Sequence, residues 1–159
     1  MKYKFISFEG IEGSGKSTQA KMLHDSLVQK NIDAIITREP GGSKASELIR
    51  EILLSDKIAK LESKSEVLLN FAARVEHIEK LIKPALQTGK IVICDRFVDS
   101  TYAYQGDGFG VDKNIIAQIE KIATNNFLPD ITFLIDVPVD AAFKRILGRD
   151  TNNRYEKLG

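Results

Sequence analysis

The sequence predicts an α/β fold, a three-layer sandwich in which a parallel sheet lies between two layers of helices. Short apolar runs typical of buried strands alternate with longer segments in which apolar residues recur at helical spacing. A glycine-rich loop joins the first strand to the first helix, as in sheets that bind ligands at the carboxyl ends of their strands. A chain of 159 residues with 43% hydrophobic residues can build one sizeable core, so we expect a single domain over residues 1–159.

Composition limits the kinds of partner. Lysine and arginine number 23 against 22 acidic residues, which argues against a broad nucleic-acid surface or a polybasic membrane tail. The single cysteine, Cys94, cannot form an intrachain disulfide, and no apolar run approaches the roughly 18 residues that cross a bilayer. No cleavable apolar signal follows Met1. We therefore expect a cytoplasmic protein with a small charged ligand and with neither a nucleic-acid nor a membrane partner.

The glycine-rich loop follows a predicted strand at residues 3–8 and precedes helical spacing from residue 19. It matches G-x-x-x-x-G-K-[ST] at every fixed position. Glycines let backbone N–H groups turn toward phosphate oxygens, the lysine adds a positive charge, and the serine hydroxyl can bind Mg²⁺. A simple turn that opens a helix is the alternative. We predict a nucleotide phosphate site made of Gly10, Ile11, Glu12, Gly13, Ser14, Gly15, Lys16, Ser17 and Thr18.

The first helix is expected to run from the loop to about residue 30, where Asn31 can end it, and a buried strand follows at 34–37. That strand leads into Arg38 and a Glu-Pro-Gly-Gly turn. Loops at the carboxyl ends of strands often hold ligands, although Pro-Gly-Gly alone is ordinary turn chemistry. A short amphipathic helix is predicted at 48–54.

The longest helix is predicted at about 65–87, with a kink or a new first turn at Pro84. A polar stripe runs beside its apolar stripe. On spacing alone the polar stripe fits a solvated face. Arg74, however, stands among apolar neighbours, where a guanidinium needs a partner. The stripe consists of Glu66, Asn70, Arg74 and His77.

A continuous apolar run at 91–94 predicts a central strand buried on both faces, and it ends in Asp95 and Arg96. At the ligand edge of the sheet, Asp95 can hold Mg²⁺ through water and Arg96 can bind a phosphate. A structural ion pair is the alternative. The following segment, Ser100 to Gln105, is dense in groups that could bind a base and a sugar, but the same residue types also make ordinary loops.

The remaining pattern predicts a helix at 115–123, a buried strand at 131–135 and a helix at 142–147. From residue 144 to 159 there are five basic residues against two acidic ones. Such a segment is either a solvated helix end or a lid whose arginines stabilise charge on a transferring phosphoryl group. We place this lid near residues 144–157.

Six motifs, in order, closely resemble bacterial thymidylate kinase over essentially the whole chain. They are Phe8-Glu9-Gly10, Thr37 to Gly42, Ala72-Ala73-Arg74, Asp95-Arg96, Tyr104-Gln105-Gly106 and Arg149 to Arg154. The resemblance implies the P-loop nucleoside triphosphate hydrolase/nucleoside monophosphate kinase fold, with five strands. It also implies a further helix, strand and closing helix after the lid, a C-terminal part that this sequence lacks.

The resemblance implies transfer of the ATP γ-phosphoryl group to dTMP, with Mg²⁺, in dTTP biosynthesis. Lys16 and the loop would hold the donor phosphates, and Ser17, Asp95 and Glu9 would organise the metal. Glu9 and Asp95 would also organise the sugar 3′-hydroxyl. On the acceptor side, Arg96 would anchor the 5′-phosphate, Arg74 would address the thymine edge and Tyr104 would pack against the deoxyribose. Further expected acceptor contacts are Arg38, Ser100, Thr101 and Gln105.

One position departs from the family's pattern, and another identifies the type within the family. The aromatic residue that stacks on thymine is usually four residues before the helix arginine, where this sequence has Asn70, and Phe71 could take its place. Within the family, one type carries an arginine in the phosphate loop and another supplies the catalytic arginine from the lid. This loop has Glu12 and Ser14 instead of an arginine, so the resemblance is to the type with a lid arginine. Arg149 is the expected catalytic arginine, followed by Arg145 and Arg154.

The resemblance also implies a homodimer, for which the apolar faces of the helix between Leu68 and Ile82 are candidates. Two other functions stay open at this stage. A deoxynucleoside kinase would share the loop and the carboxylate-arginine pair but phosphorylate a sugar hydroxyl. A catalytically inactive nucleotide-binding module would bind ATP without turnover.

Overall fold

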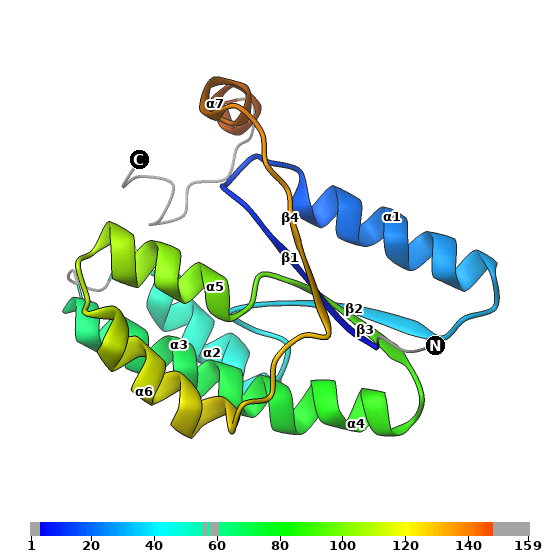
Figure 1. Cartoon of the computed structure of the whole chain (residues 1–159), viewed down its shortest axis with the longest axis horizontal. Helices are drawn as coiled ribbons and strands as arrows, with labels where there is room; N and C mark the ends of the chain where they lie inside the picture. The colour runs from blue at the N-terminus through cyan, green and yellow to red at the C-terminus, as the bar shows by residue number, and fades with distance from the viewer. Residues whose placement is uncertain (1–3, 56, 58–60, 148–159) are drawn as a thin grey trace.

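The computed structural model describes residues 4–55, 57 and 61–147. Its centre is a four-stranded sheet in the order β2-β3-β1-β4, in which every neighbouring pair is parallel (Figure 1). The strands are β1 (Phe5–Glu9), β2 (Ala34–Arg38), β3 (Ile91–Asp95) and β4 (Ile131–Leu134).

Helices cover both faces of this sheet. One face carries α1 (Lys16–Gln29), while α2 (Lys44–Leu54), α3 (Ser63–His77) and α6 (Lys113–Thr124) lie on the other (Figure 1). The predicted three-layer α/β fold is therefore confirmed. The remaining elements are η1 (Ile78–Ile82), α4 (Lys83–Gln87), α5 (Val98–Thr101), η2 (Tyr102–Gly108) and α7 (Val139–Leu147).

Two apolar clusters hold the layers together, because side chains alternate between the faces of a strand. Phe5 and Val92 point toward α3 and pack with Phe71. Ile6 and Ile93, one residue further along the same strands, point toward α1. β1 and β3 thus use both faces, as the continuous apolar runs predicted.

The edge strands of the described sheet are more exposed than predicted. The sequence pattern predicted buried strands at 34–37 and 131–135, but Ile36 is 44% exposed and Leu134 is 72% exposed. β2 pairs only with β3 and β4 only with β1, so each lacks the second neighbour that shields the central strands. Apolar runs of this length do not distinguish a central strand from an edge strand.

The long helical region runs from residue 63 to residue 87, close to the predicted range, but it has three parts. α3 passes into the π-helical turn η1, and α4 then begins with Pro84 in its first turn. Proline has no N–H to donate to the preceding turn, so the change in helical geometry falls where the hydrogen-bond ladder is interrupted. This agrees with the predicted kink or new first turn.

The carboxyl ends of β1, β2 and β3 meet at one edge of the sheet. The register pairs Phe8 with Asp95 and Arg38 with Asp95, so the loops after these strands lie next to one another. α7 lies beside the loop between β1 and α1 (Figure 1). Among the described helices, none is long and apolar enough to cross a membrane.

Candidate active site

The loop at residues 10–15 leaves the N-terminus of α1 open. Gly15 is the residue before the helix, and no side chain caps the first turn. That turn also has no acidic side chain, so its free N–H groups and the helix dipole favour an anion. All the residues predicted to bind ATP, 10–18, belong to this loop or to the first turn of α1. The predicted strand, loop and helix context is therefore present.

Lys16 is buried inside this loop. Its ammonium donates a hydrogen bond to the Ile11 carbonyl oxygen, with an N to O distance of 2.7 Å. Burial, together with the nearby positive charge of Arg96, lowers the pKa of Lys16 to about 8. The nearby carboxylates of Glu12 and Asp95 act in the opposite direction. A bound phosphate would add a further negative charge and favour the protonated ammonium.

Ser17 and Asp95 form the candidate metal site. The Ser17 hydroxyl donates a hydrogen bond to the Asp95 carboxylate, which joins α1 to the carboxyl end of β3. Hydroxyl and carboxylate oxygens are suitable ligands for Mg²⁺, which usually keeps water and phosphate oxygens as its other ligands. The chemistry of this pair therefore fits the ion, and both predicted residues lie together.

Glu9, at the end of β1, has other hydrogen-bond partners. One of its carboxylate oxygens accepts a hydrogen bond from the Phe97 backbone N–H at 2.6 Å, and the other accepts one from the Ser100 hydroxyl at 2.7 Å. Burial raises the pKa of Glu9 above its ordinary value, against these hydrogen bonds. Both oxygens therefore hold the segment that follows β3, and the metal role of Glu9 stays a prediction. Glu9 thus joins the end of β1 to Phe97 and Ser100.

A cavity of about 240 Å³ connects the loop to α3. Its wall includes side chains from the carboxyl ends of β2 and β3 and from the segment after β3. It therefore brings together residues that are far apart in the sequence. The predicted site residues in this wall are Glu12, Lys16, Ser17, Arg38, Arg74, Asp95, Arg96, Ser100, Thr101, Tyr104 and Gln105.

Arg96 projects into the cavity from a strained backbone position, with a φ angle of 70°. One terminal nitrogen contacts the Glu12 carboxylate at 2.8 Å and the Tyr104 hydroxyl at 3.3 Å. The other donates to the Gly10 carbonyl and to the Ser100 hydroxyl, each at 3.2 Å. Its ion-pair partner is thus Glu12 of the loop, whereas Asp95 binds Ser17.

Arg74 is buried and held on two of its nitrogens. Nε donates to the Glu39 carboxylate at 2.7 Å, and Nη2 donates to the Phe97 carbonyl and the Thr101 hydroxyl at 3.2 Å. Nη1 is buried without a hydrogen-bond partner among the described residues. The solvated-face alternative is therefore wrong for most of the polar stripe on α3, because Glu66, Arg74 and His77 are all buried.

Phe71 does not fit its predicted role. It is 2% exposed, belongs to the core and is not part of the cavity wall, which Asn70 joins instead. Helical spacing turns Phe71 toward the sheet, where its ring supports Arg74, whose guanidinium carbon is 4.7 Å from the ring centre. We therefore no longer propose that Phe71 contacts the base.

Gln105 lines the cavity next to a buried carboxylate. Its side-chain nitrogen donates to Glu66 at 3.3 Å. An amide whose nitrogen faces a carboxylate presents its oxygen as an acceptor elsewhere, which gives this side chain a defined polarity.

Sequence reasoning missed two charged residues of this cavity. Glu39 joins β2 to α3 through Arg74, and Arg50 of α2 donates to the Pro40 carbonyl at 2.7 Å. Glu39 is the first residue of the predicted Glu-Pro-Gly-Gly turn and belongs to the motif Thr37 to Gly42, but it was not among the predicted site residues. Arg50 is one charged position on an amphipathic helix, and nothing in its spacing separates it from a solvated arginine.

α7 brings a further arginine to the loop. Arg145 Nη1 lies 3.2 Å from the carbonyl oxygens of both Gly13 and Ser14. Gly13 has a φ angle of 73°, and a Cβ there would lie 2.5 Å from the Ala142 carbonyl, so the close approach of α7 requires glycine. The other two arginines predicted for the lid, Arg149 and Arg154, lie outside the described residues.

Comparisons with known proteins agree with this geometry. The family model described as thymidylate kinase matches residues 8–158. The thymidylate kinase of Ectopseudomonas mendocina (strain ymp) is 43% identical over 155 residues, covering 98% of this chain and 74% of the relative. The thymidylate kinase of Ruthia magnifica subsp. Calyptogena magnifica is 48% identical over 153 residues, covering 96% and 75%.

A solved structure gives the same result. The crystal structure of thymidylate kinase from Ehrlichia chaffeensis has a TM-score of 0.78 to this chain at 46% identity, covering 90% of this chain and 81% of that chain. This chain spans about three quarters of the length of the two curated relatives. With a family model that matches nearly all of it and relatives above 40% identity, the chain belongs to the thymidylate kinase family.

Proposed function

We propose that this chain transfers the γ-phosphoryl group of ATP to the 5′-phosphate of dTMP inside the cavity between the loop and α3. Its family makes it a kinase of dTMP that yields dTDP, a step toward dTTP. One observation carries the assignment of the site: Lys16, Arg96 and Arg74 line the same cavity. A donor phosphate bound at Lys16 would then lie next to an acceptor phosphate bound at Arg96, with the base of the acceptor at Arg74.

The donor side is built from the loop. Free N–H groups at the start of α1 would donate hydrogen bonds to the ATP phosphates, and the Lys16 ammonium would donate to a phosphate oxygen in place of the Ile11 carbonyl oxygen. Ser17 and Asp95 would hold Mg²⁺, which neutralises phosphate charge when it is bound. We further propose that this reaction takes place in the cytoplasm, as the sequence predicted.

The acceptor side is built around Arg96. Its guanidinium contacts neutral oxygens and one carboxylate, so a phosphate dianion would find a donor already directed into the cavity. Glu9 of β1 accepts a hydrogen bond from Ser100, and the Ser100 hydroxyl accepts one from Arg96. These two contacts fix the position of the Arg96 guanidinium relative to β1. Tyr104, whose ring centre is 5.2 Å from the Arg96 guanidinium carbon, would pack against the deoxyribose.

The base side has a donor and an acceptor. Arg74 offers Nη1, which has no partner among the residues that the structure describes. Gln105 offers its amide oxygen because its nitrogen faces Glu66. Thymine has an acceptor at O4 and a donor at N3, which is the matching pattern. Cytosine has the opposite groups at these positions, so its amino group would face a guanidinium.

The first test compares three acceptors under identical conditions: dTMP, thymidine and dCMP. We expect robust ADP release only with dTMP, because thymidine leaves the Arg96 charge without a phosphate and dCMP mismatches the base contacts. The assay measures coupled ADP release and dTDP by chromatography, with the Lys16→Ala variant as the inactive control. Faster turnover of thymidine would indicate a deoxynucleoside kinase, and ATP binding without dTDP would indicate an inactive module.

The second prediction concerns the protonation of Lys16. With a lowered pKa of about 8, the free ammonium loses its proton as pH rises through that value, whereas bound ATP favours the charged form. ATP binding should therefore take up roughly half a proton near pH 8 and almost none near pH 6.5, and it should weaken above pH 8. Calorimetry in two buffers of different ionisation enthalpy measures this uptake.

The Lys16→Arg variant is the matched control for that experiment. A guanidinium stays charged throughout the range, so proton uptake near pH 8 should disappear even if ATP binds more weakly. Equal proton uptake in the wild type and in this variant would mean that another group titrates.

The third prediction concerns the lid. The loop supplies no arginine, and Arg145 already binds loop carbonyls, so we propose that Arg149 stabilises the transferring group. Arg149→Ala should lower kcat roughly a hundredfold or more and change the KM for dTMP much less. Lys144→Ala, which removes an exposed charge from α7, is the control. An unchanged kcat in Arg149→Ala would exclude the role.

The fourth prediction concerns assembly into a homodimer. Ile78 and Ile82 belong to the core, which removes them from the predicted contact, but Leu68 of α3 is 56% exposed. Leu48 of the adjoining helix α2 is also exposed. We propose that α2 and α3 face a second copy of the chain, since an exposed apolar face gains free energy when it is covered.

Light scattering after size exclusion tests this interface. Leu68→Glu should convert a dimer into a monomer, because a charge at an apolar contact is desolvated without a partner. Val28→Glu on α1, which lies on the opposite face of the sheet, should leave the mass unchanged. A monomeric wild-type chain, or a dimer that persists in Leu68→Glu, would contradict the proposed interface.

A further inference from the structure

His77 is a buried polar residue that the proposed chemistry does not use. It is 0% exposed at the end of α3, three residues after Arg74, and it is not part of the cavity wall. A histidine in such a position needs partners for both ring nitrogens. The partners of its two ring nitrogens therefore indicate which residues His77 positions.

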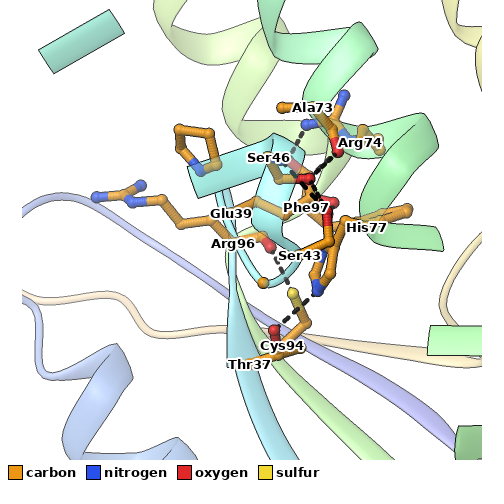
Figure 2. A network of polar contacts seen from close by, with 12 residues as sticks. Thr37, Glu39, Ser43, Ser46, Ala73, Arg74, His77, Cys94, Arg96 and Phe97 are labelled. Atoms are coloured by element: carbon orange, nitrogen blue, oxygen red, sulfur yellow. Dashed lines mark hydrogen bonds and ion pairs between the residues drawn. The ribbon is translucent and has the colours of Figure 1, made fainter. Parts of the chain in front are cut away.

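Both ring nitrogens of His77 are engaged (Figure 2). Nδ1 lies 3.0 Å from a carboxylate oxygen of Glu39, and Nε2 lies 2.8 Å from the Thr37 hydroxyl. An ionised carboxylate only accepts, so Nδ1 carries the proton and donates to Glu39. In the neutral ring, Nε2 then accepts from the Thr37 hydroxyl. The end of β2 and the end of α3 are thus joined through one imidazole.

Glu39 lies between His77 and Arg74 (Figure 2). One of its oxygens accepts from His77, and the other accepts from Arg74 Nε at 2.7 Å. With each oxygen bound to a different donor, the carboxylate plane is fixed from two sides. Glu39 in turn fixes the guanidinium, which also donates through Nη2 to Phe97 and Thr101. Nη1 is the one Arg74 nitrogen without a hydrogen-bond partner among the described residues.

The loop after β2 is shaped around this histidine. Gly42 has a φ angle of 92°, and a Cβ there would lie 2.4 Å from His77 Cδ2 and 2.4 Å from His77 Nε2. It would also lie 2.7 Å from the Thr37 hydroxyl. Any side chain at this position would push the ring away from both of its partners. The backbone therefore makes room for the pair of Thr37 and His77.

We infer that His77 is a positioning residue which, through Glu39, sets the direction of Arg74 Nη1 and so the selectivity for a pyrimidine with a keto group at C4. The inference rests on the proposed function, because it takes Arg74 as the donor to the base. Without the imidazole, Glu39 loses one of its two anchoring donors and can rotate, and Arg74 rotates with it. Groups that hold phosphates are not part of this chain of contacts.

Two substitutions of His77 separate positioning from filling space. His77→Asn places an amide N–H near the position of Nδ1 and can still donate to Glu39, whereas His77→Leu fills similar volume without a donor. We expect His77→Leu to raise the KM for dTMP about tenfold and to lower the kcat/KM preference for dTMP over dCMP by a similar factor. The KM for ATP should stay within about twofold. His77→Asn should recover most of both losses.

The readout that decides is the ratio of kcat/KM for dTMP to that for dCMP, measured with thermal unfolding of each variant. A loss of stability with an unchanged ratio in His77→Leu would overturn the inference and leave His77 as a core residue. If His77→Leu does not fold, Thr37→Val removes only the hydroxyl partner, and it should lower the same ratio by a smaller factor. An unchanged ratio in folded Thr37→Val would then overturn the inference.

Arg74→Gln separates the inference from the proposed function on which it rests. A fall in the ratio for Arg74→Gln but not for His77→Leu would overturn the inference alone. An unchanged ratio in Arg74→Gln would overturn the proposed base contact itself, and the inference with it.

Discussion

The parallel pairing of β1 with β3 is the constraint on which the site depends. This register places Phe8 beside Asp95, so the loop after β1 and the charged pair after β3 leave the sheet at the same edge. Ser17 then reaches Asp95, and Arg96 reaches Glu12. A shift of one residue would turn every buried side chain of either strand to the opposite face, so the two apolar clusters also fix the geometry of the site.

A second constraint lies between the sheet and α3, where Glu39, Arg74 and His77 are buried together. A buried charge is costly unless it is paired and hydrogen-bonded, and here the carboxylate has a donor on each oxygen. The guanidinium keeps one nitrogen that has no hydrogen-bond partner in the described part of the chain. The hydrogen bonds that reduce the cost of burying Glu39 and Arg74 thus also fix the orientation of the guanidinium. Apolar side chains at these positions would make no directional contacts.

The sequence was sufficient for the fold class, the loop and the meeting of Ser17 with Asp95, because these follow from periodicity and from a motif with fixed spacing. It was not sufficient for Phe71, since residues 70 and 71 differ by 100° around a helix and only tertiary packing decides which one faces the cavity. Burial of β2 and β4 was overestimated because strand order is not encoded in local hydrophobicity. The contact of Glu9 with the Phe97 N–H joins residues 88 apart in the sequence, and local sequence patterns do not predict such a contact.

Glu12 connects the phosphate loop to Arg96, although it occupies a variable position of the loop motif. Its carboxylate lies 2.8 Å from Arg96, so the loop that we propose to bind the donor phosphates also balances the charge of the proposed acceptor anchor. An arginine at this position would repel Arg96 and add to the desolvated positive charge near Lys16, whose pKa is already lowered. A glutamate here favours a charged Lys16 and a well-directed Arg96, but it cannot stabilise the transferring phosphoryl group. In the proposed reaction that positive charge comes from outside the loop, which is the physical reason for proposing an arginine of the lid.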